Sequence, residues 1–183
     1  TLIIDGSAIT DSLDDLTVTN NAASTLTSYT ITGGAGDDIL AGSNAADTIT
    51  GGTGTNSLTG NSGNDIITGG SGVDTISDGS GNDIVDAAAG NDIITIGAGT
   101  DNITAGAGND AITATTNLTS ADTLAGGAGT DTLTLSAATV DADFTNVTGI
   151  EALTVGTVGT FTIGAWLRLP VLPPSLLLMV RIL

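Results

Sequence analysis

Residues 60–86 read GNSGNDIIT GGSGVDTIS DGSGNDIVD, which is one nine-residue pattern repeated three times without interruption. The pattern extends from Gly33 to Thr113, giving 9 units over 81 residues. Its eighth position is a branched aliphatic residue in every unit, and its sixth is Asp and its fourth Gly in 8 of the 9. A fixed short period indicates a repeat architecture, in which each unit packs against its neighbours.

Each position of the unit has a physical role. The first six residues are expected to form a turn, because glycine permits positive φ angles and close approach of backbones. The last three should form a short strand, with the eighth side chain pointing inward and the seventh and ninth outward. Three residues bury too little surface alone, so the units are expected to stack into a solenoid with an aliphatic core.

The array becomes irregular towards both ends. Residues 114–125 form a unit of twelve residues, and residues 126–134 return to the nine-residue pattern. Upstream, residues 24–32 resemble a degenerate unit with Tyr29 in place of Asp. We therefore expect a strand-rich N-terminal flank or cap at 1–32, the repeat array at 33–134, a solenoid-like continuation or cap at 135–164, and an atypical apolar tail at 165–183.

Composition and charge exclude several function classes. The chain of 183 residues has 20 acidic and 2 basic side chains, for a formal charge of −18, so it lacks the basic face that binding to nucleic acid requires. It contains no Cys and no His, which excludes disulfides, zinc–thiolate sites and catalysis by histidine. Residues 33–113 hold 11 aspartates and no basic residue, so like charges about 4.8 Å apart in stacked turns would repel strongly.

The pattern GGxGxDxUx, where U is aliphatic, resembles the haemolysin-type (RTX) calcium-binding nonapeptide repeat. That resemblance implies an all-β, right-handed parallel β-roll with two nonapeptides per coil. It also implies several Ca²⁺ ions, each held between a turn and the turn two units later by turn carbonyls and sixth-position side chains. The implied metal ligands are Asp38, Asp47, Asn56, Asp65, Asp74, Asp83, Asp92, Asp101, Asp110, Asp122 and Asp131.

Calcium chemistry supports this interpretation independently, since Ca²⁺ takes six to eight oxygen ligands. We expect a chain that is largely disordered without calcium and folds when calcium binds. The sites that involve Asn56 should bind more weakly because they lack one charge, and residues 69–83 should form a strong site. The aspartates outside the sixth position, Asp37, Asp78 and Asp86, are expected to be exposed, with at most auxiliary roles.

The wider setting is predicted from the resemblance and the flanks. Residues 144–153 resemble segments that follow RTX arrays in bacterial surface-layer proteins and large adhesins. The resemblance implies type I secretion and a secreted or cell-surface protein that folds in extracellular calcium. Besides calcium, the partner considered is a second copy of the chain, through self-assembly at the cell surface. The alternative is an accessory secretion or folding domain of an exported protease or lipase. Catalytic motifs upstream of Thr1 would favour the enzyme, whereas continued Thr-rich strands would favour the surface protein.

Other functions fit the sequence less well. We expect no catalytic residues within these 183, because no sugar-stacking ring or perturbing pocket accompanies the carboxylates. Ice binding would need a regular Thr or Asn row, whereas the third positions of the units are irregular. In the tail, the longest uninterrupted apolar run is Leu176–Val180, too short for a membrane span, and we interpret the tail as a non-native end or a docking segment.

Overall fold

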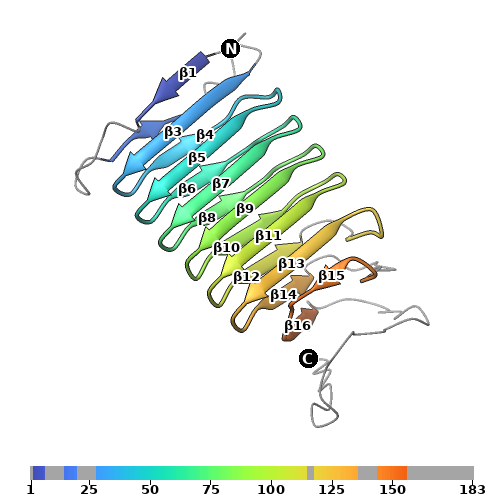
Figure 1. The fold of residues 1–183 in the computed structure, drawn as a ribbon. Coiled ribbons are helices and arrows are strands. Elements are labelled where there is room, and N and C mark those ends of the chain that lie inside the picture. The colour runs from blue at the N-terminus through green and yellow to red at the C-terminus, as the bar shows by residue number, and fades with distance from the viewer. Residues whose placement is uncertain (1, 7–14, 20–27, 115–117, 136–143, 156–183) are drawn as a thin grey trace.

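The computed structural model describes residues 2–6, 15–19, 28–114, 118–135 and 144–155. These residues form two parallel β-sheets of eight strands each, which we call the odd sheet and the even sheet after the strand numbers they contain. The chain alternates between the two sheets from one strand to the next, so it winds into successive coils. Each strand pairs with the corresponding strand of the next coil (Figure 1). The described residues include no helix, and the predicted all-β solenoid is confirmed.

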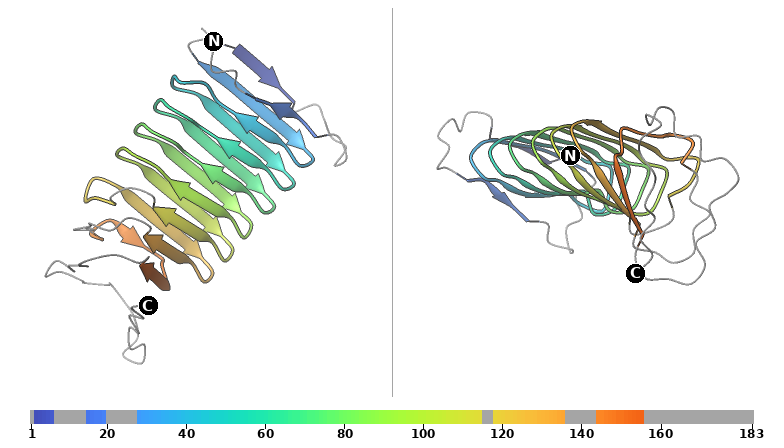
Figure 2. Two further views of the ribbon diagram at one scale, coloured as in Figure 1. Left: turned by 180° about the vertical axis from the view of Figure 1, so that it is seen from behind. Right: turned by 90° about the horizontal axis from the view of Figure 1, so that it is seen from below.

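The odd sheet contains β1 (Leu2–Asp5), β3 (Tyr29–Ala35), β5 (Thr48–Thr53), β7 (Ile66–Ser71), β9 (Ile84–Ala89), β11 (Asn102–Ala107), β13 (Thr123–Ala128) and β15 (Val147–Thr148). The even sheet contains β2 (Thr17–Val18), β4 (Ile39–Ala41), β6 (Ser57–Thr59), β8 (Thr75–Ser77), β10 (Ile93–Ile96), β12 (Ala111–Ala114), β14 (Thr132–Leu135) and β16 (Ala152–Val155). Viewed along its length, the solenoid is a stack of flattened coils (Figure 2).

The strand register confirms two nine-residue units per coil. Ile49 on β5 pairs with Ile67 on β7, and Leu58 on β6 pairs with Ile76 on β8, each pair being 18 residues apart. From Ile103 to Leu124 the step is 21 residues, because the twelve-residue unit adds three residues to one coil. The extra residues do not disturb the strands on either side, whose pairing continues in register.

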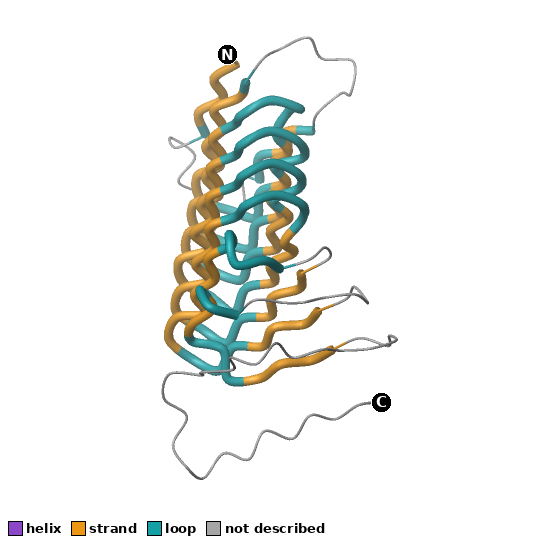
Figure 3. Tube along the Cα trace, turned by 90° about the vertical axis from the view of Figure 1, so that its right-hand side faces the viewer, coloured by secondary structure: helices purple, strands orange, loops and turns teal. Residues whose placement is uncertain are grey.

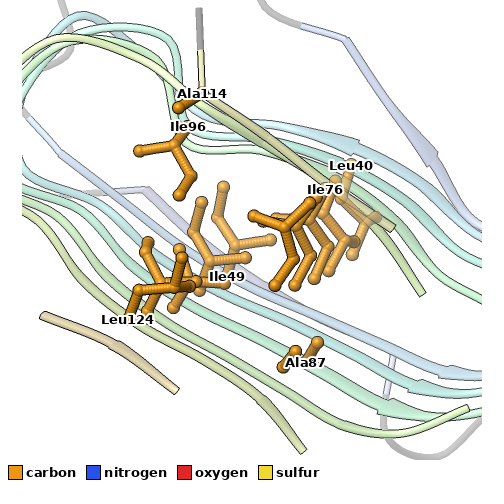
Figure 4. Packing of buried hydrophobic residues seen from close by; sticks show 14 of the residues in the cluster. Leu40, Ile49, Ile76, Ala87, Ile96, Ala114 and Leu124 are labelled. Carbon is orange, nitrogen blue, oxygen red and sulfur yellow. The ribbon is translucent and has the colours of Figure 1, made fainter. Parts of the chain in front are cut away.

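The core is two facing rows of aliphatic side chains, one from each sheet (Figure 4). All the eighth-position residues from Ile31 to Leu133 are at most 1% exposed. The residue before each of them faces outward, as Ile66 beside Ile67 illustrates with 47% of its surface exposed. This alternation is the one predicted from the sequence, and it leaves a core only two side chains thick, in which bulky aromatic rings are not needed.

The first position of the unit also faces inward, because it lies two residues after the eighth. Glycines occupy it in the early coils, whereas Ala87, Ile96, Ala105 and Ala114 occupy it later, and all four are at most 3% exposed. These four departures from the glycine pattern therefore add apolar core. The turn Ala87–Ala89, which lacks both of the first two glycines of the pattern, keeps the common register, with Ala88 at a φ of 73° opposite Gly70.

The flanks extend the two sheets. β3, which contains Tyr29, pairs with β5, and β1 pairs with β3. At the other end β15 pairs with β13, and β16 pairs with β14. The predicted tail at 165–183, together with 136–143 and 156–164 of the predicted continuation, lies outside the described residues. Among the residues that are described, no helix has the length and apolar character to cross a membrane.

Candidate metal sites

The turns stack on one another along the two edges of the solenoid (Figure 3). The sixth-position residues end these turns, so they lie in two rows, one along each edge. In each row the residue directly precedes a strand of one sheet, so we call them the even row and the odd row. The even row contains Asp38, Asn56, Asp74, Asp92, Asp110 and Asp131, and the odd row contains Asp47, Asp65, Asp83, Asp101 and Asp122. All of these side chains are at most 5% exposed, although ten of the eleven are carboxylates.

Each side chain in a row is tied to the coil before it. One oxygen accepts a hydrogen bond from the backbone N–H of the sixth-position residue in the preceding coil, as in Asp47 to Asp65 at 2.8 Å and Asp74 to Asp92 at 2.8 Å. The contact recurs along both rows, with N···O distances of 2.8–3.0 Å between row members. The spacing of one coil therefore brings together the residues that the sequence pattern paired.

The second oxygen of most of these carboxylates is buried and has no hydrogen-bond partner among the described residues. This holds for Oδ2 of Asp38, Asp65, Asp74, Asp83, Asp92, Asp110 and Asp131. An unpartnered buried polar atom costs roughly 1–3 kcal/mol, and more when it is charged. Such a recurring deficit on one type of atom indicates a missing positively charged partner.

The first glycine of the unit leaves space for these oxygens. A Cβ atom at Gly69 would lie 2.5 Å from Oδ2 of Asp74 and 2.6 Å from the carbonyl oxygen of Ala87. A Cβ atom at Gly60 would likewise lie 2.6 Å from Oδ2 of Asp65 and would clash with the carbonyl oxygen of Asp78. A carboxylate oxygen and a carbonyl oxygen of the next coil thus converge beside the glycine. These are the hard oxygen donors that Ca²⁺ prefers.

Burial also affects the protonation of the rows. Desolvation raises the pKa of Asp65 to about 7, with a smaller upward contribution from the charges of Asp83 and Asp47. Desolvation raises the pKa of Asp92 to about 6, again with repulsion from its row neighbours. Without a cation, the folded chain therefore disfavours the ionised form of these carboxylates.

The odd row has two members whose second oxygen is already bonded by the protein. Oδ2 of Asp47 accepts hydrogen bonds from the backbone N–H and the hydroxyl of Ser43, at 2.5 and 3.0 Å. Oδ2 of Asp122 accepts them from the backbone N–H and the hydroxyl of Thr119, at 2.7 and 3.2 Å. These two carboxylates depend less on a cation than Asp65 and Asp83 do.

A further acidic residue joins the even row beyond the repeat pattern. Oε2 of Glu151 accepts a hydrogen bond of 2.8 Å from the backbone N–H of Asp131, the contact that a sixth-position residue of the next coil would make. Glu151 was not predicted as a site residue, because the nine-residue phase is lost before it. The sequence did carry a signal, because Glu151-Ala152-Leu153-Thr154 matches the order of Asp131-Thr132-Leu133-Thr134, an acidic residue two positions before the inward aliphatic one.

The prediction for the aspartates outside the sixth position was right for two and wrong for one. Asp37 and Asp86 are exposed. Asp78 is completely buried, because it follows Ile76 by two residues and the strand alternation turns it inward. Desolvation raises the pKa of Asp78 to about 7, and the charges of Asp101 and Asp83 also contribute. The alternation itself was the signal that could have placed Asp78 correctly.

Comparison with known families agrees with this geometry. A family model described as RTX calcium-binding nonapeptide repeat (4 copies) matches residues 30–58, 41–76, 59–94, 95–115 and 118–137, which together cover more than half of the chain. The chain belongs to the RTX calcium-binding repeat family. No curated protein and no solved structure matched the chain.

The buried oxygens of this RTX chain fit the cation that its family binds. The unpartnered Oδ2 atoms of Asp38, Asp65, Asp74 and Asp131 each lie near a carbonyl oxygen of the next coil. Residues 33–113 contain no basic side chain that could neutralise the row carboxylates. A divalent cation bound there would satisfy the oxygens and lower the pKa of the carboxylates. The RTX repeats are therefore a calcium-binding β-roll.

Proposed function

We propose that this calcium-binding β-roll is a module of an exported bacterial protein of the surface-layer or adhesin type, and that it folds when it meets calcium outside the cell. One observation carries the proposal, namely the two rows of buried carboxylates, most of whose second oxygens have no hydrogen-bond partner among the described residues. Repulsion between the buried carboxylates destabilises the metal-free fold, and a bound cation removes that repulsion. Folding is then controlled by the calcium concentration of the compartment.

The rows couple cation binding to folding through two opposing effects. In the folded chain, Asp65 and its neighbours Asp47 and Asp83 lie one coil apart, and their charges raise the free energy of the metal-free fold. In the unfolded chain these carboxylates are hydrated and far apart. Ligands that converge only in the folded state make the free energy of metal binding a free energy of folding.

The ligands proposed for calcium are the sixth-position side chains of both rows together with turn carbonyls. Asp65, Asp74, Asp83, Asp92 and Asp110 contribute most in this proposal, because their second oxygens are buried and unpartnered. Asp47 and Asp122 contribute less, because Ser43 and Thr119 already bond them. Asn56 contributes a neutral oxygen only.

Export is proposed from the calcium concentration that such sites need. Extracellular calcium-binding modules have dissociation constants of roughly 10⁻⁴–10⁻³ M, far above the free calcium of a cytosol. The surface-protein assignment rests on residues 144–153, which resemble segments that follow RTX arrays in surface-layer proteins and adhesins. Within this part of the chain the proposed role is not catalytic. Each row carboxylate is buried, and one of its oxygens accepts a hydrogen bond from the neighbouring coil.

Far-UV circular dichroism during a calcium titration tests the proposal. We expect a coil spectrum in chelator and a cooperative change to a β spectrum as Ca²⁺ rises to about 10 mM, with no such change in Mg²⁺. A β spectrum that does not depend on calcium would overturn metal-coupled folding. Sedimentation velocity over the same titration separates folding of single chains from calcium-bridged assembly, because only assembly raises the molecular mass.

A further inference from the structure

Asp78 occupies a position at which the other units have glycine or an apolar residue. It is the first residue of its unit, between Gly60 one coil earlier and Ile96 one coil later. Its side chain is completely buried. Oδ1 accepts hydrogen bonds from the backbone N–H groups of Gly79 and Gly97, at 2.6 and 2.7 Å, while Oδ2 has no partner.

The carboxylate of Asp78 lies close to the carboxylates of two members of the odd row. One carboxylate oxygen from each of Asp78, Asp83 and Asp101 lies within 4.8 Å of the other two. All three side chains are at most 3% exposed, and Oδ2 of Asp83, like that of Asp78, is buried and unpartnered. Two ligands on opposite sides of a Ca²⁺ ion are about 4.8 Å apart, twice the usual Ca–O distance, so three oxygens this close can share one ion.

We infer that Asp78, Asp83 and Asp101 form a three-carboxylate site for a divalent cation of the calcium class, and that it binds more tightly than the positions between two row members. The inference rests on calcium binding by the roll, but it adds a ligand and an order of affinity that the nine-residue pattern does not contain. Three negative charges meet one cation here, where a row position offers two. Charge count is one of the factors that set the affinity of calcium sites.

The donor set favours a hard cation. Only oxygen ligands are present, and the chain contains no Cys or His to select a softer metal. Backbone contacts hold Asp78 and Asp101 in place, because Asp78 accepts from Gly97 and Asp101 accepts from Asp83 at 3.0 Å. Asp78 belongs to the turn that Asp83 ends, and Asp101 ends the corresponding turn of the next coil, so the site spans two coils and forms only in the folded chain.

Calcium binding to the whole chain, measured by competition with a chromophoric chelator, tests the site. The variants are Asp78→Asn and Asp78→Gly. The first keeps an acceptor for Gly79 and Gly97 and removes the charge. The second introduces glycine, the residue found at the equivalent position of the two preceding coils, Gly42 and Gly60. Asp86→Asn, which changes an exposed aspartate, is the matched control.

We expect the wild-type chain and Asp86→Asn to bind one Ca²⁺ at least about tenfold more tightly than the remainder, and both Asp78 variants to lose this tight class. The variants should still give a β spectrum at high calcium. An unchanged tight class in both Asp78 variants, or no class tighter than the rest in the wild type, would overturn the site. Failure of the wild type to respond to calcium at all would contradict the proposed function instead.

Discussion

The backbone N–H of Asp65 donates a hydrogen bond to Oδ1 of Asp83, 2.8 Å away and one full coil further along the chain. The donor belongs to a residue that is itself a carboxylate in the same row. Each row is therefore a chain of backbone-to-carboxylate contacts between groups whose charges repel. In the folded chain these contacts orient the ligands, and under the proposed function the repulsion between their charges makes the metal-free fold unstable.

Replacement of Asp65 by Asn should raise the calcium midpoint of folding by roughly tenfold, since a charged ligand is lost while the hydrogen bond to Asp47 can remain. Asp47→Asn is the matched comparison in the same row. Its effect should be clearly smaller, because Ser43 already bonds the second oxygen of Asp47. Circular dichroism titrations measure both midpoints. Equal shifts would contradict the distinction between partnered and unpartnered carboxylates.

Replacement of Asn56 by Asp should have the opposite effect. Nδ2 of Asn56 is buried without a partner, and Oδ1 accepts from the N–H of Asp38 at 3.0 Å. The carboxylate keeps the acceptor and adds a charge next to Asp38 and Asp74, so calcium should bind several-fold more tightly and the metal-free fold should be less stable. Isothermal titration calorimetry measures the first effect. Weaker binding by the variant would refute the ligand role of this position.

The metal-free chain should be more structured in mild acid than at neutral pH. The pKa of Asp65 is raised to about 7 and that of Asp92 to about 6 in the folded chain, from 3.8 in the reference state. The folded state therefore binds more protons than the unfolded state between these values, and its stability falls as pH rises from about 4 to 7. Circular dichroism in chelator at pH 5 and pH 7.5 measures the difference, and a greater β content at pH 7.5 would contradict it.

Calcium should reverse this trend, because cations and protons compete for the same oxygens. In saturating calcium, the free energy of unfolding should rise between pH 5 and pH 7. Urea denaturation at both values, with calcium held constant, provides the measurement. The comparison with the chelated chain serves as the control, since a general effect of acid would act in the same direction on both.

Replacement of Ile67 by Ala should lower the free energy of unfolding in saturating calcium by about 2–5 kcal/mol. Its side chain is 1% exposed and lies in the aliphatic row of the odd sheet. Ile66→Ala, one residue earlier on β7, is the control, because that side chain faces outward and is 47% exposed. Its cost should be below about 1 kcal/mol. Chemical denaturation compares the two variants, and similar costs would contradict the assigned register.

Replacement of Ala88 by Gly should stabilise the roll by about 0.5–1 kcal/mol, because Ala88 has a φ of 73° and glycine removes the steric strain of that conformation. The reverse change at its register partner, Gly70→Ala, should destabilise by about 2 kcal/mol or more. Gly70 has a φ of 126°, and a Cβ atom there would clash with the carbonyl oxygen of Gly52. Thermal denaturation in saturating calcium should show opposite shifts.

The sequence by itself determined the solenoid and which residues make up the even row and the odd row. Nine residues cannot bury a core alone, and the strict period of the aliphatic residues requires a stack. The period also specifies which aspartates share an edge, because two units make one coil. Ile67 inside, Ile66 outside and Asp65 beside Asp83 all follow from that spacing and the alternation of a strand.

Only the tertiary structure decided which carboxylate oxygens lack a partner. The pattern treats Asp47 and Asp65 alike, yet the hydroxyl of Ser43 bonds the second oxygen of Asp47, whereas no described residue bonds that of Asp65. Asp78 was predicted to be exposed and is buried beside Asp83 and Asp101. Glu151 takes up the even row outside the repeat phase. The physical reason is that partnering depends on neighbours one coil away, which the local pattern of a single unit does not contain.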